Sequence, residues 1–361
     1  MSTDKIEAKY SRRSKRWKLI IIGLVGALIA VLIICLNISI APISFSEILN
    51  ILGKQIPFLN NLINPSAISS TNEAIILQIR LPRVLGGAIV GAGLAAAGVM
   101  YQGIFRNPMA DSYLLGASAG ASFAYTLAVL FGGMVALNVI GLGFSQIAAF
   151  AGALLTVFLV YLISRVGNKV PVTTLLLSGI VANIFILSLQ TVLVFRAGER
   201  LQGIIAFTFG GSLTTLTWNN LLVVFPIVLA GTIIAYFFTR DLNMLSMGDE
   251  TAQHLGVNTE RVRQVLLVAS SLITGAVVSI SGVIGFVGLI IPHMTRLIIG
   301  PDHRILLPAT AIVGAIFLVF CDSIARVATG VAELPVGAIT ALFGTPVFIY
   351  LLRRRKTTYA M

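Results

Sequence analysis

The sequence predicts an all-α integral membrane protein with about ten transmembrane helices, and its composition and apolar runs indicate this class. Hydrophobic residues make up 57% of the 361 residues, and only 13 residues are Asp or Glu. This is too little polar surface to cover a water-soluble globule. Several runs approach the roughly 20 apolar residues that a helix needs to cross a bilayer, at 19–36, 147–163, 221–238 and 305–320. The strands of a membrane barrel would alternate apolar and polar residues instead.

The formal net charge of +12 comes from basic clusters that lie between the apolar segments. This is the positive-inside pattern, and it predicts a multi-pass topology with both termini in the cytoplasm. We therefore expect a basic cytoplasmic N-terminal tail over 1–18, one transmembrane domain over 19–352 and a cytoplasmic C-terminal tail over 353–361. No basic stripe is interleaved with aromatic residues, so nucleic-acid binding is not expected.

The first apolar segment ends near Leu36, and the longest stretch of mixed polarity follows it, which we place outside the membrane. Within that stretch a short surface helix is expected over 46–52, with Ser44 or Ser46 as its cap. The start of the chain also has the basic and then apolar order of a signal peptide. Because the apolar stretch is long and no small-residue cleavage site follows, it is predicted to be a retained first span.

The second span is predicted over 84–105, with Pro82 marking its entry. It is dense in Gly and Ala, and Gly87 and Gly91 have GxxxG spacing. Small residues let helix backbones approach closely, so this helix is expected inside the bundle. The other spans are expected at 113–131, 144–164, 174–195, 218–238, 265–281, 283–299, 307–328 and 337–352.

Two places interrupt these spans, one at Asn107 and Pro108 and one around Pro292, where Gly285 and Gly288 precede the proline. Breaks in membrane helices are tolerated where protein or a water-filled cavity satisfies the freed backbone groups. We therefore expect both breaks to line or border a pathway. Each break follows a Gly-rich helix, which favours a weak internal repeat.

Motifs for chemistry are missing from the sequence. It has no phosphate-binding loop, zinc pair, nucleophile elbow or paired-carboxylate site, and its three histidines lack metal-ligand spacing. We therefore expect no catalysis, no metal site and no directly bound cofactor. Asp322 and Arg326 are one helical turn apart and can pair. A carrier driven by protons or sodium would place charged residues at the middle of the membrane, and no good set is seen, although this class stays open.

A charged island at 246–264 stands out in this apolar chain. Ser246 can cap a short helix, and Asp249 and Glu250 lie in its first turn, where the helix dipole favours acidic side chains. Gly256 can end this helix. The pattern therefore predicts one short helix between two membrane spans.

A second helix is expected to follow directly, with Asn258 or Thr259 as its cap. Between the two helices Ala252, Leu255 and Val257 supply a small apolar contact surface. Such a surface is typical of a short helix that lies across a membrane face and is presented to a cytosolic partner. A solvated connector between spans is the alternative.

Four motifs in order resemble one family from about Ile79 onward: "IRLPRVLGGAIVGAGLAAAGVMYQGIFRNPMADSYLLGASAGAS", "GDETAQHLGV", "GFVGLIIPHMTRLIIGPDHRILLPATAIVGA" and "DSIARVATGVAELPVGAITALFGTPVFIYLLRRR". The chain resembles the FecCD permeases of type II ABC importers for iron-siderophores, heme and cobalamin. The resemblance implies the type II importer permease fold in the cytoplasmic membrane of a bacterium or archaeon. It also implies pairing with a second permease, identical or paralogous, with the path at their interface.

The resemblance implies two cytosolic ABC ATPase subunits that hydrolyse ATP and move the spans of the permease through short coupling helices at about 246–262. The residues of this chain that match the ATPase-coupling segment are Gly248, Asp249, Glu250, Ala252, Leu255, Gly256 and Val257.

The resemblance also implies an extracytoplasmic binding protein that presents carboxylates to Arg80, Arg83 and Arg326. Guanidinium groups suit forked pairing with carboxylates, and Arg80 and Arg83 lie outside against the positive-inside bias. Anchoring of a helix end or pairing with Asp322 is the alternative. The expected cargo is an iron(III)-siderophore, with heme or cobalamin as alternatives. Functions of a different class are also open: a carrier driven by an ion gradient, or a membrane scaffold or sensor that transports nothing.

Overall fold

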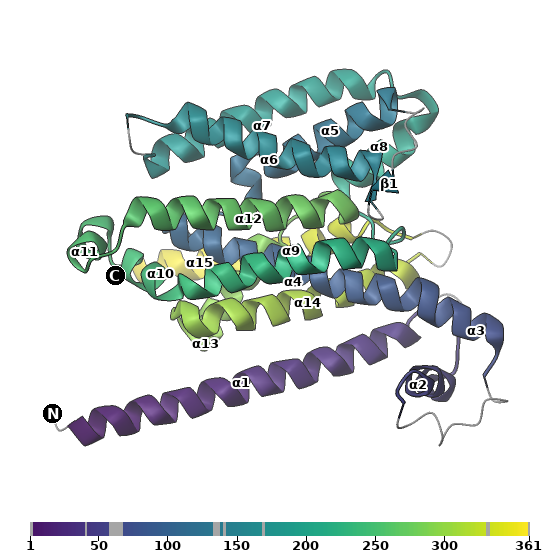
Figure 1. The fold of residues 1–361 in the computed structure, drawn as a ribbon, viewed down its shortest axis with the longest axis horizontal. Helices are drawn as coiled ribbons and strands as arrows, with labels where there is room; N and C mark the ends of the chain where they lie inside the picture. Colours follow the sequence, from purple (N-terminus) through teal and green to yellow (C-terminus); the bar gives the residue numbers. More distant parts are fainter. Residues whose placement is uncertain are drawn as a thin grey trace.

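The computed structural model describes the backbone of residues 3–39, 42–57, 68–132, 138–139, 142–167, 170–329 and 333–359. This part of the chain is a stack of long helices that lie side by side, with one pair of two-residue strands, β1 (Asn138–Val139) and β2 (Leu142–Gly143) (Figure 1). The all-α prediction is confirmed.

Ten helices correspond to the predicted spans in the described residues. Seven helical stretches are long and apolar enough to cross a membrane, by length and composition, and three apolar helices are shorter. They are α1 (Thr3–Asn37), α4 (Leu81–Phe105), α5 (Ala117–Phe131), α6 (Phe144–Ser164), α7 (Val172–Val194), α9 (Trp218–Phe237), α12 (Thr259–Ser281), α13 (Val287–Ile299), α14 (His303–Val327) and α15 (Val336–Tyr359).

Short helices lie at the two ends of the bundle. Helices α10 (Thr239–Leu245) and α11 (Asp249–His254) lie at the end where both chain termini are found (Figure 1). We call it the coupling end, because the predicted coupling segment lies there. Helices α2 (Phe45–Lys54), α3 (Ser70–Ala74) and α8 (Leu201–Phe209) lie at the opposite end. The remaining elements of the described part of the chain are a π-helical turn, Ile75–Arg80, and two 3₁₀ turns, Ser112–Leu115 and Gly198–Arg200.

The two predicted tails are not separate from the neighbouring spans. Helix α1 begins at Thr3, so the predicted N-terminal tail over 1–18 continues the first span as one helix. Helix α15 continues to Tyr359, and only 360–361 of the predicted C-terminal tail lie outside the described residues. The surface helix is confirmed, because the Ser44 hydroxyl accepts a hydrogen bond from the Glu47 backbone N–H at 3.3 Å.

The expected entry of the second span at Pro82 is wrong. The helix begins at Ser70 and passes through the π-helical turn into α4, so Pro82 lies in the first turn after that insertion. A π-turn shifts the hydrogen-bond ladder by one residue, which makes room for a residue without a backbone N–H. The rule that a proline opens a helix therefore fails here.

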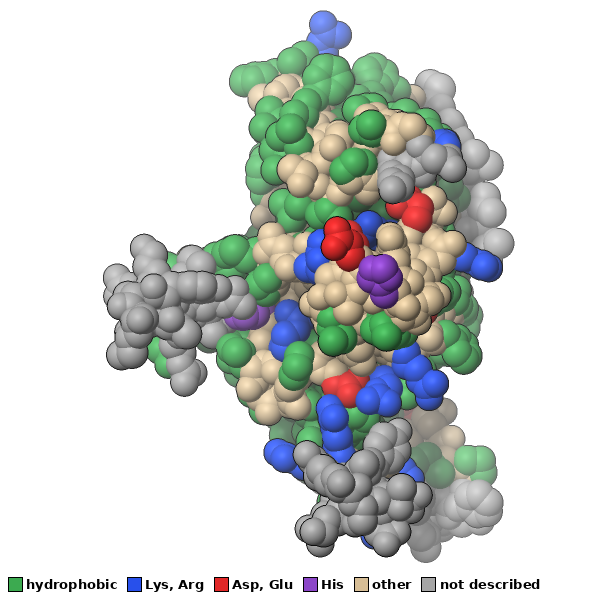
Figure 2. Space-filling model, turned by 90° about the vertical axis from the view of Figure 1, so that its left-hand side faces the viewer, with side chains coloured by type: hydrophobic (Ala, Val, Ile, Leu, Met, Phe, Trp, Pro, Cys, Tyr) green, Lys and Arg blue, Asp and Glu red, His purple; other side chains and the backbone are tan. Residues whose placement is uncertain are grey.

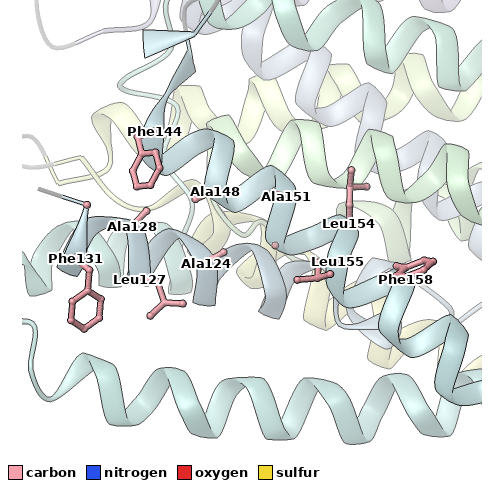
Figure 3. Close-up of a pocket in the computed structure, with 12 residues that line it drawn as sticks. Ala124, Leu127, Ala128, Phe131, Phe144, Ala148, Ala151, Leu154, Leu155 and Phe158 are labelled. Carbon is pink, nitrogen blue, oxygen red and sulfur yellow. The ribbon is translucent and has the colours of Figure 1, made fainter. Parts of the chain in front are cut away.

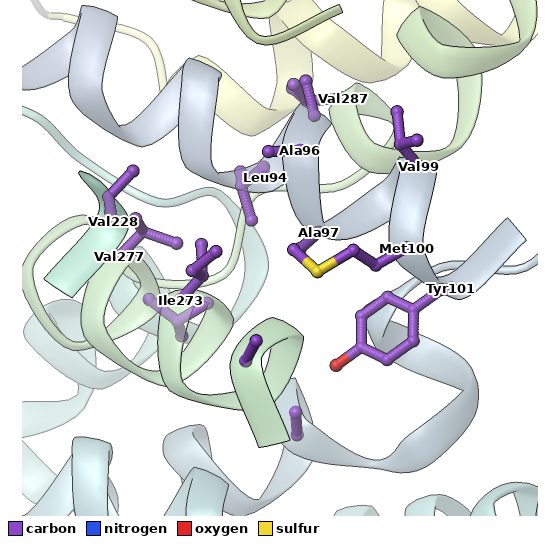
Figure 4. Close-up of a cluster of buried hydrophobic side chains, with 14 of the residues drawn as sticks. Leu94, Ala96, Ala97, Val99, Met100, Tyr101, Val228, Ile273, Val277 and Val287 are labelled. Atoms are coloured by element: carbon purple, nitrogen blue, oxygen red, sulfur yellow. The ribbon is translucent and has the colours of Figure 1, made fainter. Parts of the chain in front are cut away.

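Helix α4 is almost completely buried and is the centre of the hydrophobic core. Its side chains meet those of α12, α9 and α13 (Figure 4). The side chains of this cluster that the figure labels include Leu94, Ala97 and Met100 on α4, Ile273 and Val277 on α12, Val228 on α9 and Val287 on α13. The sequence prediction that this Gly-rich helix lies inside the bundle is consistent with its burial.

Glycines allow two neighbouring helices to approach α4 at backbone distance. A Cβ added to Gly91 would collide with the carbonyl oxygen of Gly314, and one added to Gly98 would collide with the carbonyl oxygen of Gly288. Gly87 is less crowded, because its nearest neighbour would be a Leu213 methyl at 3.2 Å. The GxxxG spacing therefore identified one of the two close contacts and missed Gly98.

Pro292 lies inside α13, and the break expected around it is found earlier, over 282–286. Gly285 lies in this break, whereas Gly288 lies in the first turn of α13. Because proline has no N–H, Pro292 cannot donate to the carbonyl of Gly288 four residues before it. That carbonyl faces Gly98 instead, so the proline contributes to close helix packing and does not break the helix. The other break is confirmed, because α4 ends at Phe105.

Replacing Gly98 with leucine is expected to lower the stability of the protein in detergent by more than about 1–3 kcal/mol, because the new side chain meets backbone. Thermal unfolding of the purified chain measures this. Gly26→Leu is the matched control, since nothing lies within 4 Å of a Cβ at Gly26. Equal melting temperatures for the two variants would contradict the packing of α4 against α13.

Candidate functional site: a coupling end and a buried arginine cluster

The predicted ATPase-coupling residues lie together at the coupling end of the bundle. Viewed onto this end, acidic side chains and a histidine stand near the middle and Lys and Arg side chains lie around them (Figure 2). Helix α11 carries Asp249 and Glu250 in its first turn, as predicted. The charged island is therefore gathered on one exposed face.

Two glycines shape the turns around α11. Gly248 is the N-cap with φ +117°, and Gly256 follows the helix with φ +86°, a conformation that favours glycine. The predicted cap Ser246 is wrong, because it ends α10 instead. Asn258 caps α12 as expected, with its side-chain oxygen accepting from the Arg261 backbone N–H at 3.0 Å.

The apolar residues of this segment divide into two groups. Ala252 and Val257 are buried at 0% and 7% exposure, so the expectation that they belong to the contact surface is wrong. They fix α11 against the bundle. Leu255 is 57% exposed and Met247 is 67% exposed, and these two side chains form the apolar part of the surface.

Salt bridges join α11 to two spans. The Asp249 carboxylate is 2.6 Å from the Arg263 guanidinium on α12 and 3.6 Å from the Arg106 guanidinium, which directly follows α4. The Arg263 side chain is only 11% exposed, so this pair is screened less than a surface pair. The inner side of α11 is thereby fixed, while Glu250 and Leu255 face outward.

Asp302 forms a second network at the coupling end that the sequence did not predict. Its carboxylate accepts hydrogen bonds from Arg304, Asn243 on α10 and Arg13 on α1. Burial alone would raise the pKa of Asp302, but the bonds from Arg304 and Asn243 outweigh it and hold the pKa at about 2. The guanidinium carbons of Arg13 and Arg304 are 4.7 and 5.4 Å from the centroid of the Trp17 ring. The part of α1 around Arg13 and Trp17 is therefore attached to the start of α14.

At the opposite end, two of the predicted docking arginines surround one buried carboxylate. The Arg83 guanidinium is 2.9 Å from Asp322 and 2.9 Å from Glu333, and the Arg326 guanidinium is 3.2 Å from Asp322. The side chains of Arg83, Arg326 and Asp322 are 10%, 4% and 3% exposed. In this structure Arg83 and Arg326 therefore pair with Asp322, which was the alternative to docking of a carboxylate from another protein.

Arginines also cap the end of α1. Arg80 donates to the Leu36 carbonyl at 3.1 Å, and Arg326 donates to the Cys35 carbonyl at 3.3 Å. These carbonyls belong to the last turn of a helix and have no partner within it. In this conformation Arg80, Arg83 and Arg326 are thus buried within the chain, so docking of a carboxylate from outside stays a prediction.

The predicted pathway residues are not brought to one place. Asn107 and Pro108 form a turn after α4 at the coupling end, where the Asn107 side chain accepts from the Met109 N–H at 3.0 Å. Gly285 lies in the break before α13, where its carbonyl accepts from the Thr340 hydroxyl of α15 at 3.1 Å. That the two breaks border one pathway stays a prediction.

An open groove of about 1030 Å³ lies between α5 and α6 (Figure 3). Its lining includes Phe131, Phe144, Leu155 and Phe158, and every lining residue is apolar or glycine. Among the described residues that line it, none has a charged or hydrogen-bonding side chain that would select a polar ligand. Within the described residues, no group of three or more His, Cys, Asp or Glu could hold a metal ion.

A solved structure is closely similar to this fold. It is described as an inward-facing conformation of a metal-chelate type ABC transporter. The TM-score is 0.77 at 33% identity, and the match covers 93% of this chain and 99% of the other. The helical arrangement is therefore that of an ABC transporter permease.

Three relatives are transport permeases that are named for different cargoes. The cobalamin import permease of Halobacterium salinarum is 42% identical over 80% of this chain and 76% of its own length. The hemin permease of Yersinia pestis is 39% identical over 80% of this chain and 86% of its own length. The iron(3+)-hydroxamate permease of Bacillus subtilis is 37% identical over 80% of this chain and 73% of its own length. The family model of the FecCD transport family matches residues 13–354. The chain therefore belongs to the FecCD transport family of ABC importer permeases.

Proposed function

We propose that this permease moves an iron(III)-siderophore across the cytoplasmic membrane of a bacterium or archaeon, after an extracytoplasmic binding protein has delivered it. Two cytosolic ABC ATPase subunits hydrolyse the ATP, and a second permease, identical or paralogous, completes the path. The observation that carries this proposal is the coupling end, where α11 is fixed to α12 and exposes Leu255.

The arrangement of α11 supports a mechanical contact with an ATPase. Asp249 joins the helix to Arg263, and the buried Ala252 holds its inner side. A push on the exposed side is therefore passed to the spans and is not absorbed by a flexible loop. A solvated connector, the alternative, has no need for a buried anchor and a half-buried salt bridge.

The buried charges argue against a carrier driven by an ion gradient. Such a carrier needs a carboxylate in its membrane region that can gain and lose an ion during the cycle. Among the described side chains of the ten spans, Asp322 is the one buried Asp or Glu, and it is held between Arg83 and Arg326. Proton binding there would separate a buried ion pair, which is costly.

Both chain ends lie at the coupling end, which supports placing both termini in the cytoplasm (Figure 1). The siderophore assignment is supported by the iron-hydroxamate relative and by the metal-chelate transporter of the same fold. Heme and cobalamin are the alternatives, since permeases for these cargoes match the chain at similar identity.

Uptake of labelled ferric siderophores, heme and cobalamin tests the cargo, in cells that lack the gene and in cells that carry it again. Restored uptake of a ferric siderophore alone is the expected result. Restoration of heme or cobalamin uptake instead would replace the cargo within the same family. Uptake that survives ATP depletion and collapses with an ionophore would contradict the ATP-driven function.

A further inference from the structure

Helix α12 connects the coupling end to the opposite end of the molecule in one piece (Figure 1). It begins directly after α11, and its Arg263 holds Asp249 of that helix at 2.6 Å. It contains no proline, whereas α9, α13, α14 and α15 each contain one inside the helix. Because it is unkinked by proline and packed on several neighbours, α12 is suited to tilt as one body.

The far end of α12 is joined to the segment around α8 by backbone hydrogen bonds. The Val283 N–H donates to the Phe207 carbonyl at 2.9 Å, and the Ser212 N–H donates to the Ser281 carbonyl at 2.7 Å. Phe207 lies on α8, and Ser281 is the last residue of α12. We call these two bonds the α8–α12 joint.

Gly211 and Gly282 make this close approach possible. They have φ values of +58° and +70°. A Cβ added to Gly282 would lie 2.7 Å from the Phe207 carbonyl oxygen, and one added to Gly211 would lie 2.8 Å from the Ser281 carbonyl oxygen. Any larger residue at either position would therefore force the two segments apart.

The other side of α8 is held by buried side chains. The Thr208 hydroxyl is 2.7 Å from the Ser122 hydroxyl of α5 and accepts from the Gln190 amide of α7 at 2.8 Å. The Phe207 ring stacks on Tyr125 with centroids 3.8 Å apart. Separating buried polar groups is costly. Helix α8 is therefore attached to α12 on one side and to α5 and α7 on the other.

We propose that α12 transmits movement of α11 to α8 at the opposite end, with Gly211 and Gly282 as positioning residues of the α8–α12 joint. The proposal rests on the proposed contact between α11 and an ATPase. Movement of α11 enters α12 through the Asp249–Arg263 pair, and the backbone bonds of the joint carry it to α8. The helix α8 and the spans attached to it then shift with the nucleotide state of the partner.

The variant Gly282→Ala tests the joint in the complete transporter, and Gly203→Ala is the matched control. Gly203 lies on α8, the helix on the other side of the joint, but nothing lies within 4 Å of its added Cβ. We expect Gly282→Ala to keep basal ATP hydrolysis and to lose its stimulation by the binding protein, with uptake reduced about tenfold. A purely structural role would lower assembly and basal hydrolysis together. The control is expected to behave as the unchanged chain.

A spin label at Gly203→Cys provides a second measurement that needs no change at the joint, since the native Cys35 and Cys321 are buried. Its spectrum is expected to change when a non-hydrolysable ATP analogue is added. An unchanged spectrum, or normal stimulation in Gly282→Ala, would overturn the proposal. If Leu255→Asp still abolishes uptake in that case, the proposed function stands without the joint.

Discussion

Replacing Leu255 with aspartate is expected to abolish uptake while the permease still folds and reaches the membrane. Leu255 is 57% exposed, so the change costs the folded chain little. A carboxylate would place an unpaired charge in the proposed contact with the ATPase, which costs several kcal/mol when the partner buries it. Co-purification of the ATPase and uptake of the cargo measure the effect.

The conservative variant Leu255→Ile is the control and is expected to retain uptake. Gly256→Pro gives an independent test of the same segment, because proline fixes φ near −65° and Gly256 has φ +86°. Both Leu255→Asp and Gly256→Pro should uncouple ATP hydrolysis from transport. Normal ATPase co-purification and uptake in both would show that α11 is a solvated connector.

The substitution Asp322→Ala is expected to destabilise the protein by about 3–5 kcal/mol, because it leaves two buried guanidinium groups without their shared partner. Arg83 and Arg326 both contact this carboxylate. Loss of folded protein on mild heating in detergent measures the change.

Glu333→Gln is the matched control for Asp322→Ala. It removes another acidic partner of Arg83, but its side chain is 34% exposed and the Asp322 pair is left intact. A smaller loss of stability is expected. If Asp322→Ala melted no earlier than Glu333→Gln, the buried cluster would not hold the ends of α1 and α14 together.

The same cluster changes how docking of the binding protein is tested. Arg83→Glu would place a third carboxylate beside Asp322 and Glu333, so loss of folding and loss of docking would not be separated. A binding protein that uses these arginines has to compete with carboxylates already present in the chain. Affinity for the binding protein measured in folded Glu333→Gln is therefore the cleaner probe.

The fold could be predicted from the sequence because membrane helices leave a strong local signal. Apolar length and basic loops identified the ten helices, and the cap candidates Asn258 and Thr259 placed the start of α12 to within one residue. Pro82 and Ser246 were misjudged, because the same residue types also fit a π-turn insertion and the end of a preceding helix. Whether such a residue begins a helix, ends one or lies within one depends on the neighbouring turns and not on the residue type.

The sites were predicted less completely, because their geometry depends on contacts between distant segments. Sequence spacing paired Asp322 with Arg326, but nothing local shows that Arg83 and Glu333 join them. The burial of Ala252 likewise depends on which side of α11 faces the bundle. Backbone hydrogen bonds such as those of the α8–α12 joint leave no side-chain pattern, and only their glycines point to them.

We infer that ATP hydrolysed by a partner drives import through this chain. Uptake of a labelled ferric siderophore into vesicles that contain the complete transporter, with the binding protein outside and ATP inside, tests this. Uptake that requires ATP, persists with an ionophore and is lost in Leu255→Asp is the expected result. Uptake without ATP that collapses with the ionophore would contradict it.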